Sequence, residues 1–279
     1  MGYPMAGHLS QDKDIDLYIY NRTNSVSAKW LNQFKGLKLK LSDAPNIKLD
    51  GLITCLKDDE SIIKVLITNK LIKLLKKNSF IIDHSSTSIE LINTISSHNY
   101  ITKNKISFFD APVSGGEVGA INGTLSIMFG GPNKKISKIN KLMSSYSSSI
   151  VKIGPSGHGQ LTKMVNQLCI AGLLQGLSEG IALGKSSNLN MNKVFEAISG
   201  GAAQSWQMDN RFKTMVDGKF DFGFAVDLMI KDLKIALNQA GLENLDLRTS
   251  NSVIKNYKEL SKEGLGNLDT SSLIKLLEK

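Results

Sequence analysis

The segment GPSGHGQLTKMVNQ contains a lysine and an asparagine whose spacing suits acid–base chemistry. Lys163 and Asn166 are three residues apart, so on a helix they lie on the same face. An ammonium group can donate a proton to a carbonyl oxygen while an adjacent amide orients the substrate. The alternative is a structural lysine at a helix edge, whose methylene stem covers apolar neighbours. The pattern leaves both interpretations open.

A second candidate site lies in FFDAPVSGGEVG, where an apolar strand runs directly into Ser114, Gly115 and Gly116. Paired glycines let backbone N–H groups approach a ligand closely, because no Cβ intervenes. The Ser114 hydroxyl adds a donor, so the loop suits a small carboxylate at the carboxyl end of a sheet. A plain surface turn is the alternative.

The strand DLYIY ends in Asn21, Arg22 and Thr23. In a dinucleotide-binding unit this position faces the adenine ribose, where an acidic residue selects NAD and Arg accommodates the 2′-phosphate of NADP. Neutral Asn21 beside Arg22 therefore favours NADP and leaves NAD open, although an ordinary polar exit from a strand explains the same residues. Further along, Lys231 lies in the helical pattern MIKDLKIAL. It can reach toward a cofactor while Asp232 pairs locally, and a surface network of charged residues four apart is the alternative.

The elements that must position these residues alternate between strands and helices up to residue 154. Short apolar runs typical of strands occur at DLYIY, NIKL, GLITCL, SFIIDHS, ISFFDAPV, TLSIMFGG and SIVKIG, and helical patterns occur at residues 25–34, 60–67, 70–77 and 134–146. This alternation predicts an α/β fold with a doubly wound, mainly parallel sheet of the Rossmann type.

After this region the pattern changes. Residues 160–186 are apolar nearly all round, which predicts a long helix buried on most sides, and everything downstream is helical in pattern. We therefore expect a dinucleotide-binding domain at residues 1–154 and an all-α substrate and dimerisation domain at residues 155–279. The small residues of the long helix also predict burial against a second subunit, as a homodimer or homotetramer.

The composition restricts the classes of partner that we expect for this protein. Only three of the 34 basic residues behind the net charge of +9 are arginines, and the lysines lie in dispersed segments such as KGLKLK, interpreted as solvated helix faces. Since nucleic-acid surfaces favour arginine, we expect a small-molecule substrate and no nucleic acid. The four histidines are scattered, which predicts no metal site.

Without a signal-peptide pattern or a run near the ~20 apolar residues of a membrane span, we expect no membrane association and a cytoplasmic protein. Cys55 and Cys169 are expected as buried free thiols.

With these residues in place, the chain resembles the β-hydroxyacid dehydrogenase family over essentially its whole length. Four motifs occur in order: MGYPMAGHL as the end of a G-x-G-x-x-G-x-x-M-A fingerprint, DAPVSGG, G-x-x-G-x-G-x-x-x-K-x-x-N and K-D-L-x-x-A. GAAQSWQMDNR at residues 201–211 resembles a subgroup described as 3-hydroxyisobutyrate dehydrogenase-like. The resemblance implies hydride transfer between NADP(H) and a small 3-hydroxy acid or its semialdehyde. Tartronate or succinic semialdehyde reductases are alternatives, whereas imine reductases of this fold usually lack the lysine.

The resemblance also assigns roles. It implies that Lys163 donates and accepts the proton, that Asn166 helps to hold the substrate oxygen, and that Ser114, Gly115 and Gly116 bind the substrate carboxylate. The cofactor-binding residues that it implies are Gly2, Tyr3, Pro4, Met5, Asn21, Arg22, Thr23, Leu56, Ser86 and Lys231.

Two departures stand out. Family members often have K-x-x-N-N, whereas Gln167 occupies the last position here. Met1 and Gly2 match the end of the first motif, and the strand and first two glycines of that motif have no counterpart. Because that strand is central in the 3-2-1-4-5-6 order, we expect a split sheet with exposed edges, and we interpret the sequence as N-terminally truncated. A non-catalytic scaffold that kept the fold and lost the cofactor is the competing hypothesis.

Overall fold

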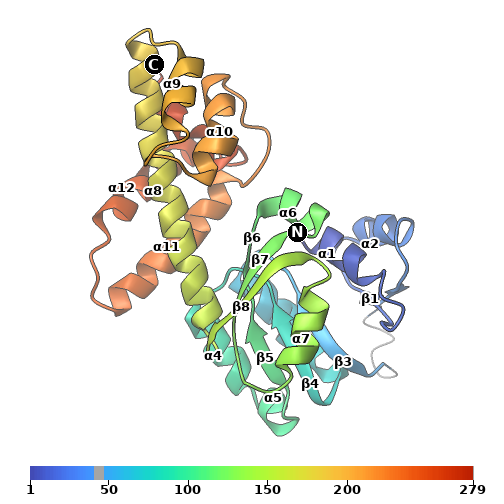
Figure 1. Ribbon diagram of the computed structural model, residues 1–279. Helices are drawn as coiled ribbons and strands as arrows, with labels where there is room; N and C mark the ends of the chain where they lie inside the picture. Colours follow the sequence, from blue (N-terminus) through green and yellow to red (C-terminus); the bar gives the residue numbers. More distant parts are fainter. Residues whose placement is uncertain (41–46, 279) are drawn as a thin grey trace. The chain divides into compact units, whose positions relative to one another are not determined.

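The computed structural model describes residues 1–40 and 47–278. They form two compact units, Met1–Lys163 and Met164–Lys279, and helix α8 (His158–Ser186) runs across the boundary between them (Figure 1). The first unit is an α/β domain with a mainly parallel sheet, and the second is helical. The fold class, the long helix and the helical C-terminal part expected from the sequence are confirmed.

The main sheet of the first unit has six strands in the order β3-β4-β5-β7-β6, with β8 paired to β7. Strands β3, β4 and β5 are parallel, as are β7 and β8, whereas β7 runs antiparallel to β5 and β6. The strands are β3 (Leu49–Thr54), β4 (Leu75–Asp83), β5 (Ser107–Asp110), β6 (Val113–Ser114), β7 (Leu125–Gly130) and β8 (Ser147–Gly154).

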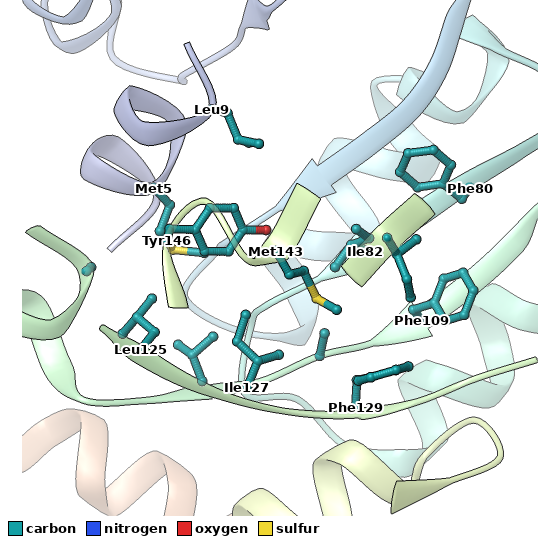
Figure 2. Packing of buried hydrophobic residues seen from close by; sticks show 14 residues of the cluster. Met5, Leu9, Phe80, Ile82, Phe109, Leu125, Ile127, Phe129, Met143 and Tyr146 are labelled. Carbon is teal, nitrogen blue, oxygen red and sulfur yellow. The ribbon is translucent and has the colours of Figure 1, made fainter. Parts of the chain in front are cut away.

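This sheet is covered on both faces, as the alternation of its buried residues shows. Phe80 and Ile82 of β4 belong to a core cluster that also contains Met5 and Leu9 of α1 (Figure 2), whereas Ile81 between them belongs to a second cluster. The period of two places successive side chains on opposite faces. The helical elements of this unit are α1 (Gly2–Leu9), α2 (Asn24–Leu31), α3 (Asp59–Ile63), the π-helix η2 (Lys64–Thr68), the 3-10 helix η3 (Leu71–Leu74), α4 (Ile89–Ser97), α5 (Asn99–Lys103), α6 (Gly116–Asn122) and α7 (Ile136–Met143).

Two expectations about lysine-rich segments are wrong. Residues 70–77, expected as a helix, are divided between the short η3 and the beginning of β4. Leu75 pairs with Leu49 of β3, so sheet pairing prevails over a spacing of leucines that fits a helix equally well. KGLKLK, interpreted as a solvated helix face, contains strand β2 (Leu37–Lys38) instead. The expected strands NIKL and GLITCL are represented by one strand, β3, and Asn46 lies outside the described residues.

The sheet is split, as expected. Strand β1 (Tyr18–Ile19) pairs in parallel with β2 in a separate two-stranded sheet, and β3 forms the end of the main sheet. Within the described residues, β1 and β3 therefore each pair along one edge only. Leu17, next to β1, and Ile53 of β3 are only partly buried, although both pack against the same core cluster. Two strand edges thus border one apolar core.

The second unit contains the rest of α8 together with α9 (Met191–Ile198), α10 (Trp206–Val216), α11 (Val226–Leu242), α12 (Arg248–Lys262) and the 3-10 helix η4 (Thr270–Leu276). Its core clusters side chains of α8, α11 and α12, including Leu174, Leu233 and Tyr257. Among the described residues, no helix has both the length and the apolar character needed to cross a bilayer.

Helix α8 is more exposed than its sequence predicts. Ala171, Leu174 and Ile181 are buried on one face. The other face carries an exposed stripe at intervals of three or four residues, which we call the α8 stripe: Val165, Cys169, Leu173, Gly176, Gly180 and Leu183. Both cysteines are thiols, as expected, but the expected burial is wrong for Cys169, which is exposed, and Cys55 is half-buried.

Candidate active site

Lys163 lies in the second turn of α8 with its ammonium group turned inward. The residue is 9% exposed, and its Nζ donates to the carbonyl of Val113 at 2.9 Å. Val113 directly precedes Ser114 in β6, so the ammonium group lies beside the loop that follows. These contacts exclude the alternative of a lysine whose ammonium group extends into solvent from a helix edge. A buried ammonium group is costly unless it has hydrogen-bond partners or a function.

The loop at residues 114–116 requires its glycines. Gly115 and Gly116 have φ of +118° and +63°, a backbone region that other residues rarely adopt. A Cβ at Gly116 would meet no atom within 4 Å, so the backbone there is openly accessible. The structure thus brings the Lys163 ammonium group and the 114–116 loop together.

Asp110, at the end of β5, fixes the beginning of α8. Its two carboxylate oxygens accept hydrogen bonds from the backbone N–H of Gly157 at 2.8 Å and of Gln160 at 3.0 Å. Burial raises the pKa of Asp110, and these hydrogen bonds oppose the shift. A Cβ at Gly159 would lie 2.4 Å from the Asp110 carbonyl oxygen, so this close approach needs glycine.

The loops after β3 and β4 are joined by a buried carboxylate, Asp83. Its Oδ1 accepts from the Thr54 hydroxyl at 2.8 Å and the Ser85 hydroxyl at 2.6 Å, and Ser85 Oγ accepts from the Leu56 N–H at 2.8 Å. Burial raises the pKa of Asp83 to about 6 against these hydrogen bonds. Leu56 and Ser86, both expected to contact a cofactor, therefore lie in two connected loops.

Helix α1 begins beside these loops. Gly2 packs against Cys55, where an added Cβ would lie 3.3 Å from the Cys55 Cβ. No side chain caps the helix, so a negatively charged group can be bound by the N–H groups of its first turn. Tyr3 donates from its hydroxyl to Gln33, Pro4 lies in the same turn, and the Met5 side chain is buried in the core.

Asn21, Arg22 and Thr23, which follow β1 after Tyr20, are exposed. The Asn21 amide donates to the Thr23 carbonyl at 3.0 Å, which shapes the turn, and Thr23 stands at the N-cap of α2. The exposed Arg22 guanidinium is available to an anionic group at this end of β1.

Side chains of the second unit form a connected series of polar contacts. The Asn166 amide donates to Gln167 Oε1 at 2.8 Å, and Gln167 Nε2 donates to Asp232 Oδ2 at 2.7 Å. Lys231 Nζ lies 2.9 Å from Asp232 Oδ1, so the expected local pairing of Asp232 is confirmed. Gln167, which departs from the family pattern, thus bridges Asn166 and the buried carboxylate of Asp232.

The expected site residues thus fall into two groups. Lys163, the 114–116 loop, the start of α1 and the loops containing Leu56 and Ser86 belong to the first unit, whereas Asn166 and Lys231 belong to the second. Sequence reasoning missed Gln160, Asp110 and Asp83, whose partners are remote in sequence. The only local signal was their place in the GHGQLTK, FFDAP and IIDHS motifs. Within the described residues, no group of three or more His, Cys, Asp or Glu side chains gathers around a metal position.

Comparison with known protein families shows which family the chain belongs to. The family model of the NAD binding domain of 6-phosphogluconate dehydrogenase matches residues 1–154. That of the NAD-binding of NADP-dependent 3-hydroxyisobutyrate dehydrogenase matches residues 157–277. The chain belongs to the β-hydroxyacid dehydrogenase family.

Relatives of this β-hydroxyacid dehydrogenase include two that match its whole length. An uncharacterized oxidoreductase of Shewanella frigidimarina is 42% identical over 283 residues, covering 100% of this chain and 95% of the relative. A probable mitochondrial 3-hydroxyisobutyrate dehydrogenase-like protein of Arabidopsis thaliana is 32% identical, covering 100% of this chain and 83% of the relative. The 2-hydroxy-3-oxopropionate reductase of Escherichia coli is 33% identical over 61% of this chain and 59% of its own length.

Solved structures share the fold. A 3-hydroxyisobutyrate dehydrogenase of Mycobacterium tuberculosis has a TM-score of 0.88 at 20% identity and covers 100% of this chain and 96% of its own. One from Salmonella typhimurium has a TM-score of 0.83 at 22% identity, with 98% of this chain and 95% of its own covered.

Family membership makes this β-hydroxyacid dehydrogenase an oxidoreductase that acts on CH–OH groups with a nicotinamide cofactor. The described residues fit such a cofactor at three places. The uncapped first turn of α1 suits a diphosphate, Asn21 and Arg22 suit the ribose side, and the loops containing Leu56 and Ser86 adjoin the start of α1 through Cys55.

Proposed function

We propose that this protein interconverts a small 3-hydroxy acid and its semialdehyde with NADP(H), in the manner of a 3-hydroxyisobutyrate dehydrogenase. The observation that carries the proposal is the inward-facing ammonium group of Lys163, bonded to the Val113 carbonyl beside the 114–116 loop. A buried cation beside an accessible glycine-rich backbone suits a substrate that has both a carboxylate and a reactive carbonyl.

The proposed roles follow from this geometry. Lys163 donates a proton to the carbonyl oxygen during reduction and accepts it during oxidation, while the bound nicotinamide supplies or accepts the hydride. The Ser114 hydroxyl and the Gly115 and Gly116 backbone bind the substrate carboxylate. Asn166, whose amide is oriented by Gln167, helps to hold the reacting oxygen.

For the cofactor, we propose that Gly2, Tyr3, Pro4 and Met5 form the helix turn that holds the diphosphate, with Met5 acting through its packing in the core. Asn21, Arg22 and Thr23 bind the 2′-phosphate side, which favours NADP over NAD because no carboxylate repels the phosphate there. Leu56, Ser86 and Lys231 supply the remaining contacts.

The names of relatives support this substrate class. The Arabidopsis relative is named for 3-hydroxyisobutyrate and the Escherichia coli relative for 2-hydroxy-3-oxopropionate. A substrate panel of 3-hydroxyisobutyrate, 3-hydroxypropionate, glycerate and 4-hydroxybutyrate, assayed with NADP and with NAD, should show its highest kcat/KM with one of the first two and NADP. A cytoplasmic location and the domain limits 1–154 and 155–279 stay predictions.

The role of Lys163 is tested by Lys163→Ala. We expect kcat to fall by about 10²–10⁴-fold, the usual contribution of a positioned proton donor, while the Kd of NADPH measured by fluorescence stays within about twofold. Lys185→Ala, at the exposed end of the same helix, is the matched control. Turnover by Lys163→Ala at the wild-type rate would remove the proposed role.

The split sheet favours a second candidate function, a scaffold that has kept the fold without binding cofactor. A fluorescence titration of the chain with NADPH separates the two. Saturable binding supports the dehydrogenase, whereas no binding at millimolar NADPH supports the scaffold.

We further propose a homodimer or homotetramer assembled through the α8 stripe. Glycines 172, 176 and 180 have no neighbouring atom within 4 Å of an added Cβ, and Leu183 is 70% exposed. Small and apolar residues along one face allow two helices to approach closely.

A further inference from the structure

Gln160 occupies an unusual position three residues before Lys163. Its side chain is buried, with 1% of the residue exposed. Its Nε2 donates to the Ser85 carbonyl at 2.7 Å, and its Oε1 accepts from the Thr87 N–H at 3.1 Å. One carboxamide therefore binds the backbone on both sides of Ser86, as a neighbouring strand would.

The backbone of Gln160 is itself held in place. Its N–H donates to Asp110 Oδ2, and the Gly157 N–H donates to the other oxygen of the same carboxylate. Asp110 is fully buried, and Gly159 approaches its carbonyl so closely that a Cβ would lie 2.4 Å from the oxygen. One helical turn later, Lys163 bonds the Val113 carbonyl. The start of α8 thus connects β5, the 85–87 loop and the segment before Ser114.

We infer that Gln160 is a positioning residue that couples the 85–87 loop to the helix carrying Lys163. This inference rests on the proposed function, in which Ser86 contacts the cofactor and Lys163 transfers the proton. Both hydrogen bonds of the Gln160 carboxamide are buried, so their loss leaves a carbonyl and an N–H without partners and frees the loop to move. A cofactor bound against Ser86 then meets a loop whose position relative to Lys163 is no longer fixed.

Hydrogen exchange of the chain without ligands tests the coupling directly. In Gln160→Met, which keeps the volume and removes both bonds, the Thr87 amide should exchange about tenfold faster or more, the effect of losing one buried hydrogen bond. Amides in β4 and β5 should be unchanged. Gln239→Met, which replaces a half-buried glutamine of α11 that bonds the neighbouring Glu243 side chain, is the control and should leave Thr87 unaffected. Wild-type exchange at Thr87 in Gln160→Met would overturn the inference.

A second variant keeps the test decisive if Gln160→Met unfolds. Gln160→Glu retains an oxygen for the Thr87 N–H and loses the donor to Ser85, so Thr87 should stay protected while the loop remains attached on one side only. Fast exchange at Thr87 in folded Gln160→Glu would also count against the inference.

Kinetics separate a positioning role from a purely structural one. In folded Gln160→Met or Gln160→Glu, we expect the KM for NADPH to rise about tenfold, with kcat at saturating NADPH within about threefold of wild type. This split is the reverse of that expected for Lys163→Ala. An unchanged KM for NADPH would refute the coupling. A wild-type chain inactive with every hydroxy acid would refute the proposed function instead, and the exchange measurements would still decide whether Gln160 holds the loop.

Discussion

Two neighbouring residues at the end of β4 are buried and titrate in opposite senses. His84 donates from Nδ1 to the Ala111 carbonyl at 2.6 Å, and its Nε2 lies 2.9 Å from the Tyr146 hydroxyl oxygen. Burial lowers the pKa of His84 to about 4 and raises the pKa of Asp83 to about 6. The common cause is desolvation, which favours the neutral form of each group.

This pair predicts an unusual dependence of stability on pH. Between pH 6.5 and 4, unfolding lets His84 gain a proton, so its contribution to the free energy of unfolding is lost as the pH falls. Asp83 acts oppositely: its contribution is full below pH 3.8 and is lost as the pH rises through about 6. The shifts correspond to energies on the order of 3 kcal/mol each, and the two should largely cancel between pH 4 and 6.

In Asp83→Asn, nothing at this position offsets the contribution of His84. The free energy of unfolding by urea should therefore fall steeply from pH 6.5 to 4. His84→Gln should do the reverse, with stability falling as the pH rises through 6. Asp110, whose pKa is also raised, changes the free energy of unfolding with pH in the same direction as Asp83. Equal pH profiles for both variants and the wild type would show that neither shift is present.

At the scale of elements, the sequence correctly predicted the features that depend on the local pattern of residues. The long apolar run of α8 and the strand–helix alternation were sufficient for the fold class, and the 114–116 loop was identified from its glycines. The pattern failed where partners are remote. Leu75 becomes a strand residue because it pairs with Leu49, and Gln160 acquires its role from Ser85 and Thr87, which no local spacing reveals.

The split sheet supplies a prediction about elements. Extending the chain before Met1 by six apolar, β-branched residues and a glycine-rich turn should give a strand that pairs with both β1 and β3. Stability against urea and the affinity for NADPH should both rise, because the apolar side chains bordering these edges become buried and the backbone there gains partners.

Slowed hydrogen exchange in β1 and β3 is the decisive measurement for the extended chain. An extension of equal length made of Gly and Ser is the control. If both extensions have the same effect, or neither changes exchange at these strands, the interpretation of the two edges is wrong.

At the scale of the whole molecule, the α8 stripe predicts self-association. Gly176→Glu places a charge in the middle of the stripe and should shift the protein toward monomer in light scattering after size-exclusion chromatography. Leu245→Lys, which replaces an exposed leucine outside the stripe, should leave the mass unchanged. Cys169 lies on the stripe, so its alkylation by iodoacetamide should become faster on dilution. A wild-type monomer at high concentration contradicts the assembly.

The continuity of α8 also bears on how its gene can change. Each residue of an α-helix turns the chain by about 100° and advances it by about 1.5 Å. Because one uninterrupted helix carries Lys163 in one unit and Asn166, Gln167 and the exposed stripe in the other, a single inserted or deleted codon between them would rotate everything downstream. A point substitution changes one side chain, whereas such a length change moves every downstream residue to another face of the helix. Natural variation in this stretch should therefore consist of exchanges at constant length.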